Sequence, residues 1–171
     1  MADVPAVPRP SQLWKQLSPE RKLQAAEAFW SDENAAVEQA DAIATIAQRI
    51  KFRAKSVMTM ALDKKSRQLA TMPGVSELVA ARLLVAYHLA QQRPMMRAFL
   101  DALGIKHDDG LIEDEDEDMQ APAADALKNA ARTLAASYPA DDVSLYLSTL
   151  IWQDPETWGA LAEAPETAVK A

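Results

Sequence analysis

The sequence predicts an all-α protein with essentially no β-sheet. The chain has 171 residues, among them only four glycines and no cysteine. Little glycine leaves few turns for hairpins, so helices are favoured. In the apolar run from Leu78 to Ala90, the only polar side chains are Arg82 and His88. At about 100° per residue, such a helix is apolar on nearly every side. We therefore expect an orthogonal multi-helix bundle around a buried central helix at about residues 77–91.

Two helices are expected before residue 51. Ser18-Pro19-Glu20 predicts a helix that runs to about Trp30, because serine accepts bonds from free amides and proline fits the first turn. Ser31-Asp32-Glu33 predicts the start of the next helix. Its apolar stripe is expected to consist of Ala36, Ala40, Ile43, Ala47 and Ile50.

The following helices are delimited by proline and glycine. Asp63 is expected to cap a short helix over residues 64–72, which Pro73-Gly74 ends. Ser76 is expected to cap the central helix. Arg93-Pro94 predicts the start of another helix, which Gly104 closes in a left-handed conformation.

The composition changes in residues 106–121, where acidic residues predict a solvated loop. Behind it, two helices are expected, followed by a short one that begins at Asp154-Pro155. The inner face of the first of these two helices is expected to consist of Leu127, Ala131, Leu134 and Tyr138. The inner face of the second is expected to consist of Val143, Tyr146, Leu147, Leu150 and Ile151. Residues 11–105 are thus expected to form a front helical bundle and residues 122–171 a rear helical unit, packed together as one domain.

The first ten residues are expected to be a disordered arm, since Pro5, Pro8 and Pro10 oppose a helix. No apolar run follows a basic start, so a signal peptide is not indicated and a cytoplasmic location is expected. A helix over residues 77–91 would be only about 22 Å long, too short for a bilayer. No membrane partner is therefore expected.

Charge is unevenly distributed along the chain. The net charge is −7. Residues 1–107 hold 15 Lys and Arg against 10 Asp and Glu, whereas residues 108–171 hold 3 against 15. This asymmetry favours an electrostatic contact, either with an anionic partner or between the two halves.

Residues 69–84 resemble the helix-hairpin-helix motif of DNA-binding and repair proteins. The matching positions are Met72, Pro73, Gly74, Val75, Ala80 and Leu83. The resemblance implies that amides of the turn and of the following helix start hold a phosphate. Ser76 occupies the place of the family's second glycine, and Glu77 after it would repel a phosphate. The alternative is a plain helical corner, in which Gly74 takes the strained conformation and Ser76 caps the next helix.

The basic segment spans residues 49–67, and its seven cations face a single acid, Asp63. Its members are Arg49, Lys51, Arg53, Lys55, Lys64, Lys65 and Arg67. Together with Gly74 and Ser76 they are the candidate contacts for an anion or nucleic acid. A solvated basic helix end is the alternative, because Phe52 is the only aromatic residue among the cations and the chain is acidic overall.

The acidic run comprises Glu113, Asp114, Glu115, Asp116, Glu117 and Asp118. It has three interpretations: a screen that folds back over the basic segment or mimics nucleic acid, a cation site, or a solvated loop. The glycine that a calcium-binding EF-hand loop requires between spaced ligands is absent.

Catalytic motifs are absent from the sequence, so a non-enzymatic protein without a cofactor is expected. His88 and His107 are the only histidines, and without cysteine or Glu-x-x-His spacing they predict no metal site. His88 is interpreted as a hydrogen-bonded core residue. Arg82 needs a carboxylate partner, for which Asp41, Glu38 and Asp101 are candidates. Trp14, Trp30, Trp152 and Trp158 are expected to seal helix junctions, or to mark a partner surface if exposed.

The favoured function from the sequence is that of a helical interaction or adaptor protein whose charged halves select another protein as partner. The alternative is a nucleic-acid-binding protein that uses the turn at residues 73–77 and the basic segment. An enzyme is the third possibility, and it would require a pocket around His88 with convergent polar groups.

Overall fold

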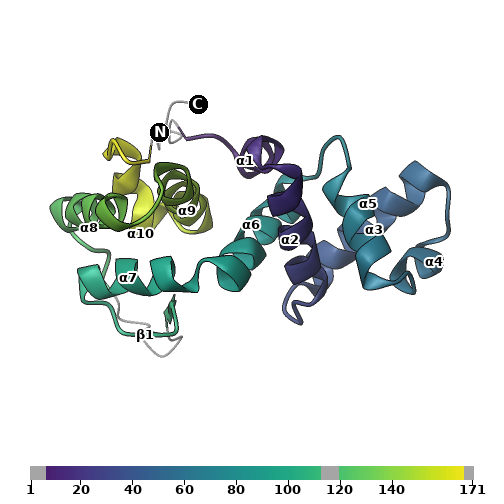
Figure 1. Cartoon of the computed structure of the whole chain (residues 1–171), viewed down its shortest axis with the longest axis horizontal. Coiled ribbons are helices and arrows are strands. Elements are labelled where there is room, and N and C mark those ends of the chain that lie inside the picture. The colour runs from purple at the N-terminus through teal and green to yellow at the C-terminus, as the bar shows by residue number, and fades with distance from the viewer. Residues whose placement is uncertain (1–6, 113–119, 168–171) are drawn as a thin grey trace. The chain divides into compact units, whose positions relative to one another are not determined.

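The computed structural model describes residues 7–112 and 120–167 (Figure 1). These residues contain ten α-helices, one short 3-10 helix and one two-stranded antiparallel sheet. The all-α prediction is confirmed. No helix in the described ranges has both the length and the apolar character needed to cross a membrane.

The described residues form two compact units. Residues 9–90 make up the first, here called the N-terminal unit, and residues 7–8 join residues 91–167 in the C-terminal unit. This division differs from the predicted one, which placed the boundary at the acidic loop over residues 106–121. The reason is that the helix over residues 93–103, expected in the front bundle, packs against a helix that follows the loop.

The N-terminal unit contains the first six helices. They are α1 (Pro10–Gln16), α2 (Pro19–Trp30), α3 (Ala36–Ile50), α4 (Ala54–Met58), α5 (Leu62–Ala70) and α6 (Glu77–Gln91). Helix α2 packs against α5, and α4 packs against α3. The predicted start of α2 is confirmed, because the Ser18 hydroxyl accepts a hydrogen bond from the Arg21 amide at 3.2 Å.

Helix α6 spans the residues predicted for the central helix, and seven of its fifteen residues are buried. Its buried side chains are Val79, Ala80, Leu83, Leu84, Ala86, Tyr87 and His88. The expectation of a helix buried on all sides is wrong at both ends, since Leu78 is 51% exposed and Ala90 is also exposed. Polar contacts of Ser76 and Glu77 hold the first turn in place of apolar packing.

Helix α3 is rotated relative to its predicted stripe. Ala36 and Ala40 are exposed, and the buried residues are Ala42, Ile46 and Ala47. The Gln39 side chain explains this rotation, because its amide donates to the carbonyls of Phe29 at 2.8 Å and Asp32 at 2.9 Å. These bonds tie α3 to the last turn of α2 and so choose which face turns inward.

Part of the predicted arm is ordered. Pro10 begins α1, a position that proline tolerates because its missing amide would have no helical partner. In the C-terminal unit, Val7 is buried and the Pro8 carbonyl accepts a hydrogen bond from Trp152 Nε1 at 2.8 Å. Residues 1–6 lie outside the described ranges.

The C-terminal unit holds the remaining elements. They are α7 (Arg93–Leu103), β1 (His107–Asp108), β2 (Leu111–Ile112), α8 (Ala124–Ser137), α9 (Ala140–Gln153), α10 (Pro155–Trp158) and the 3-10 helix η1 (Gly159–Glu163). At its centre the Phe99 ring lies edge-on to Tyr146, with ring centroids 5.6 Å apart. The predicted inner face of α9 is confirmed as buried, as is that of α8 except for the half-buried Tyr138. Gly104 ends α7 at φ +69°, in the predicted left-handed conformation.

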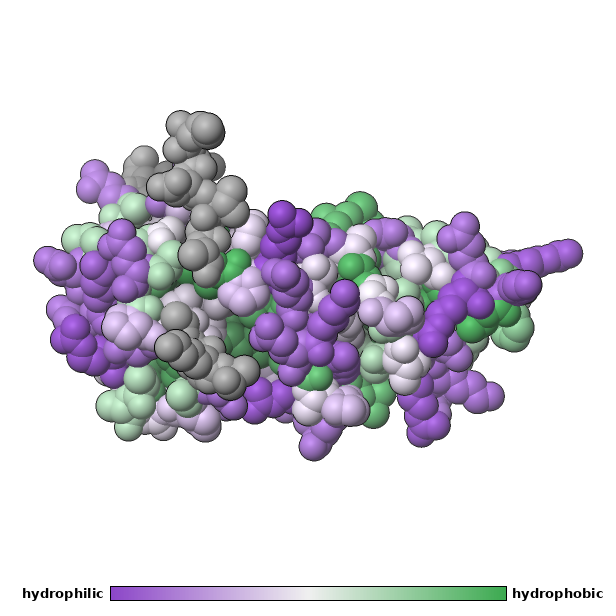
Figure 2. Space-filling view, turned by 90° about the horizontal axis from the view of Figure 1, so that it is seen from above, coloured by the Kyte–Doolittle hydropathy of each residue, from purple (hydrophilic) through white to green (hydrophobic). Residues whose placement is uncertain are grey.

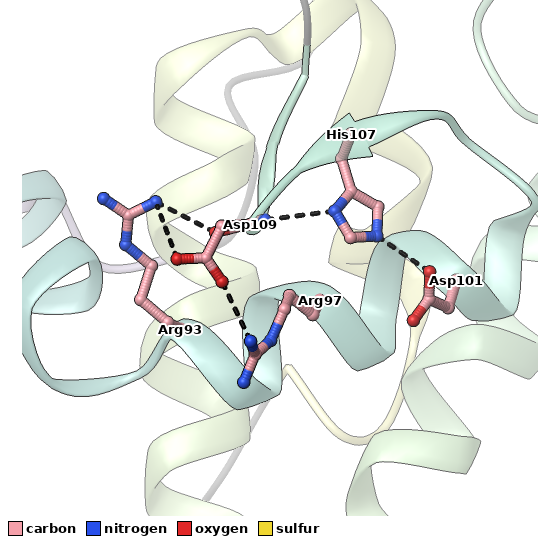
Figure 3. A network of polar contacts seen from close by, with 6 residues as sticks. Arg93, Arg97, Asp101, His107 and Asp109 are labelled. Atoms are coloured by element: carbon pink, nitrogen blue, oxygen red, sulfur yellow. Dashed lines mark hydrogen bonds and ion pairs between the residues drawn. The ribbon is translucent and has the colours of Figure 1, made fainter.

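A small hairpin occupies the start of the predicted acidic loop. Strands β1 and β2 pair through a turn at Asp109 and Gly110, with φ +49° and +90°. Asp-Gly between two short strands is a sequence signal for this turn, and the prediction of a loop missed it. Figure 3 shows the hairpin fastened to α7: Arg97 donates to the Asp109 carboxylate at 2.9 Å, and Arg93 donates to the Asp109 carbonyl at 2.9 Å.

Candidate binding surface

The turn at residues 73–77 lacks the backbone geometry expected for it. Among the described residues, only Lys51, Gly104, Asp109 and Gly110 have a positive φ, so the strained conformation expected of Gly74 is not observed. A Cβ built on Gly74 would meet only the end of the Lys15 side chain, at 3.9 Å. Neither conformation nor space therefore requires glycine there.

Two carboxylates, those of Asp41 and Glu77, already make hydrogen bonds at the start of α6. The Ser76 hydroxyl accepts from the Val79 amide at 3.2 Å, as predicted for a cap, and donates to Asp41 Oδ2 at 2.8 Å. The Glu77 carboxylate accepts from the amide and the hydroxyl of Ser11, at 3.1 and 2.5 Å. Two negative charges thus stand beside the positive end of the helix, where a phosphate would have to bind. This arrangement favours the helical corner over a phosphate site.

Arg82 finds its carboxylate in a residue that the sequence did not suggest. Its Nη2 lies 3.0 Å from Asp32 Oδ2, instead of pairing with Asp41, Glu38 or Asp101. Asp32 follows the end of α2, where the chain turns back toward α3. The pairing is set by that turn, because sequence spacing does not show which loop carboxylate meets a helix side chain.

The structure brings the basic segment together on α3, α4 and α5. Arg49 lies in the last turn of α3, Lys51 and Arg53 lie in the connection to α4, and the other members lie on α4 and α5. All but one are exposed. The exception, Lys65, is half-buried, with its Nζ 4.8 Å from the centre of the Trp30 ring. Lys65 therefore stabilises the unit through a cation–π contact.

The seven cations of the basic segment have no ion pair with any other described residue. The ion pairs within the described ranges use Arg82, Arg93, Arg97, His107 and Lys128. Asp63, the single acid of the segment, lies in the first turn of α5. The positive charge of this region is therefore not neutralised by the described part of the chain. The acidic run at residues 113–118, which was considered as a screen, lies outside the described ranges.

Three exposed apolar side chains lie within the same segment. Phe52 is 55% exposed, Met58 59% and Leu62 47%. Val57 between them is fully buried, and α4 packs against α3. Sequence reasoning noted Phe52 but missed Met58 and Leu62, because local sequence does not show which apolar residues of a short helix face water. In Figure 2 the right-hand side, which holds these helices, shows apolar surface beside projecting hydrophilic side chains.

We call the exposed cations and the large exposed apolar side chains of residues 49–64 the basic apolar surface. It consists of Arg49, Lys51, Phe52, Arg53, Lys55, Met58, Leu62 and Lys64. Exposed large apolar side chains that gather in one region of a surface are typical of interaction sites. The surface combines that feature with positive charge, and it is the best candidate for a functional site in the described chain.

Both histidines are engaged in structural bonds. His88 is buried, and its Nδ1–H donates to the Leu84 carbonyl at 2.7 Å. Burial is the main cause that lowers the pKa of His88, the Leu84 bond opposes it, and the charge of Arg21 adds a smaller decrease, so that the pKa is about 4. His107 Nδ1 accepts from the Gly110 amide at 3.1 Å, while Nε2 donates to Asp101 at 2.7 Å. His107 therefore has no free ring nitrogen to act as a general base.

The tryptophan side chains fill junctions between helices, as expected for large rings near helix ends. Trp14 and Trp158 are buried, and Trp30 and Trp152 are half-buried. Trp30 lies under Lys65, and Trp152 bonds to Pro8. None of the four is an exposed ring that would mark a partner surface.

Comparisons with family models, with curated proteins and with solved structures found no match for this chain. Within the described ranges, no group of three or more His, Asp or Glu is arranged to hold a metal ion. The functional argument therefore depends on the basic apolar surface.

Proposed function

We propose that this chain is a non-catalytic protein-interaction module that binds another protein on the basic apolar surface. The observation that supports this most directly is the exposure of Phe52, Met58 and Leu62 among cations that form no ion pair with any described residue. The structural engagement of both histidines also supports a binding role over a catalytic one.

Magnitudes indicate that charge and apolar contact would both be needed. Covering a half-exposed apolar side chain contributes about 1 kcal/mol, so the three together contribute on the order of 3 kcal/mol. Each exposed ion pair adds only about 0.2–1 kcal/mol, and salt screens it. A partner that covers the apolar side chains and also forms ion pairs gains binding free energy from both. A partner that forms ion pairs alone needs many of them.

Nucleic-acid binding is the second candidate, and it is favoured by the exposed cations, which have no ion pair within residues 7–112 and 120–167. Phe52 between Lys51 and Arg53 offers a ring for base stacking. Two observations weigh against it: the carboxylates at the start of α6 disfavour a phosphate at residues 73–77, and Met58 and Leu62 offer little to a phosphate backbone.

Capture from lysates of the native cells, with and without nuclease treatment, followed by direct binding of the identified partner, tests the proposal. The full chain is compared with an apolar variant, Phe52→Ser/Met58→Ser, and a charge variant, Lys51→Glu/Lys55→Glu. All four residues are exposed, so the fold is expected to persist. Protein binding predicts that both variants bind the partner at least about tenfold more weakly.

The matched control for the apolar variant is Val37→Ser. Val37 is 71% exposed and lies near the start of α3, about 18 Å along the helix from Arg49. This control is expected to bind normally. Binding that survives both variants contradicts the proposal. Binding that nuclease abolishes and only the charge variant weakens favours nucleic acid instead.

A further inference from the structure

From the composition of the basic apolar surface we infer the chemistry of its partner: an acidic protein segment that carries apolar side chains between its carboxylates. This inference rests on the proposed function and narrows it. It specifies which property of a partner protein the surface selects.

Charge is the first requirement. Five of the eight residues of the surface are cations, and none has an ion pair among the described residues. Asp63 is the only acid between residues 49 and 67. A neutral or basic segment would leave these cations uncompensated, whereas carboxylates complement them and speed the encounter.

Apolar contact is the second requirement, and it distinguishes a peptide from a polyphosphate. Phe52, Met58 and Leu62 come from the α3–α4 connection, the end of α4 and the start of α5. Bases stack on aromatic rings, but they gain little from exposed methionine and leucine. Leucine, methionine or phenylalanine side chains of a peptide cover all three. The surface therefore fits a chain that alternates acids with apolar residues.

Lys51 supplies an independent reason to assign this surface a role. It follows the last residue of α3 with φ +58°, a conformation in which glycine is the ordinary residue. Its side chain is exposed. Glycine would adopt this backbone conformation with less strain. The lysine therefore places a cation next to Phe52 in the chain at a cost in conformational free energy.

Fluorescence anisotropy of the full chain with synthetic probes tests the inference. One labelled peptide repeats Glu-Glu-Leu, and a second of the same length repeats Glu-Glu-Ser, so that both have the same charge. The inference predicts that the leucine peptide binds about tenfold more tightly or better, and that its affinity falls as salt is added. An oligonucleotide with the same number of charges and phosphatidylserine vesicles are expected to bind more weakly than the leucine peptide.

Variants show whether the two peptides are distinguished by the proposed surface. Phe52→Ser/Met58→Ser is expected to remove the preference for leucine, and Lys51→Glu/Lys55→Glu is expected to weaken both peptides about tenfold. Val37→Ser and Arg132→Glu are the matched controls, since both residues are exposed outside the surface. Both controls are expected to retain the preference.

Equal affinity for the two peptides, binding of neither, or tighter binding of the oligonucleotide or the vesicles overturns the inference. Those results leave the proposed function intact if the captured partner still depends on Phe52 and Met58. Loss of that dependence contradicts the proposed function itself. Light scattering that shows the chain associating with itself through Phe52 also overturns the inference, because a second copy is then the occupant.

Discussion

At Lys51 the backbone and the side chain have opposite requirements. Its left-handed backbone favours glycine, whereas its exposed cation contributes to the basic apolar surface. We predict that Lys51→Gly stabilises the chain by about 1 kcal/mol, because glycine adopts this conformation without strain. Urea denaturation measures the gain, and the leucine peptide is expected to bind the variant more weakly. An unchanged or lower urea midpoint would show that Lys51 is not strained.

His88 is expected to make stability depend on pH. Its pKa is about 4 in the folded chain, against 6.5 for a free histidine. Below pH 6.5 His88 binds a proton in the unfolded chain but stays neutral in the folded chain. The free energy of unfolding therefore falls as the pH drops toward 4. The loss by pH 4 is roughly 3 kcal/mol. Urea titrations of the full chain and of His88→Leu measure it, and the variant is expected to lose less stability between pH 6.5 and 4. Parallel curves would contradict this assignment.

At the scale of elements, the hairpin of β1 and β2 depends on Gly110. A Cβ there would lie 2.9 Å from the Cβ of Met96 on α7, and the residue has φ +90°. We predict that Gly110→Ala destabilises the chain by roughly 2–3 kcal/mol, through both the clash and the strained backbone. Gly104→Ala is the matched control: its φ is +69° and no atom lies within 4 Å of the added Cβ, so only strain applies. Equal decreases in the denaturant midpoint of the two variants would show that a Cβ at residue 110 causes no clash with α7.

Several helices were predictable because their signals are local. Helix ends are set by residues that act within one turn of the helix concerned. This holds, as predicted, for the helix starts at Ser18-Pro19 and Ser76 and for the helix end at Gly104. The face of α3 was not predictable in this way. Gln39 selects it by bonding to carbonyls at the end of another helix, and no periodicity within α3 reports that contact.

At the scale of the whole molecule, the division into two units predicts that residues 9–90 fold without the rest. This unit has its own buried residues on α2, α3, α5 and α6. A fragment of this length buries enough apolar surface to be stable, though only marginally. We expect helical circular dichroism and cooperative unfolding from it. A fragment of residues 11–105, which follows the boundary expected from sequence, is the comparison and should gain no stability from the added helix. A fragment over residues 9–90 that stays unfolded would contradict the division.

The sequence by itself determined the fold class, the central helix and the concentration of positive charge between residues 49 and 67. These follow from composition, from apolar periodicity and from caps, all of which act over short distances along the chain. Only the tertiary structure decided that Glu77 bonds to Ser11, that Arg82 pairs with Asp32, and that α7 belongs with α8. It also decided that Met58 and Leu62 face water. The physical reason is that each depends on which distant segment packs beside a residue, and local sequence does not specify that neighbour.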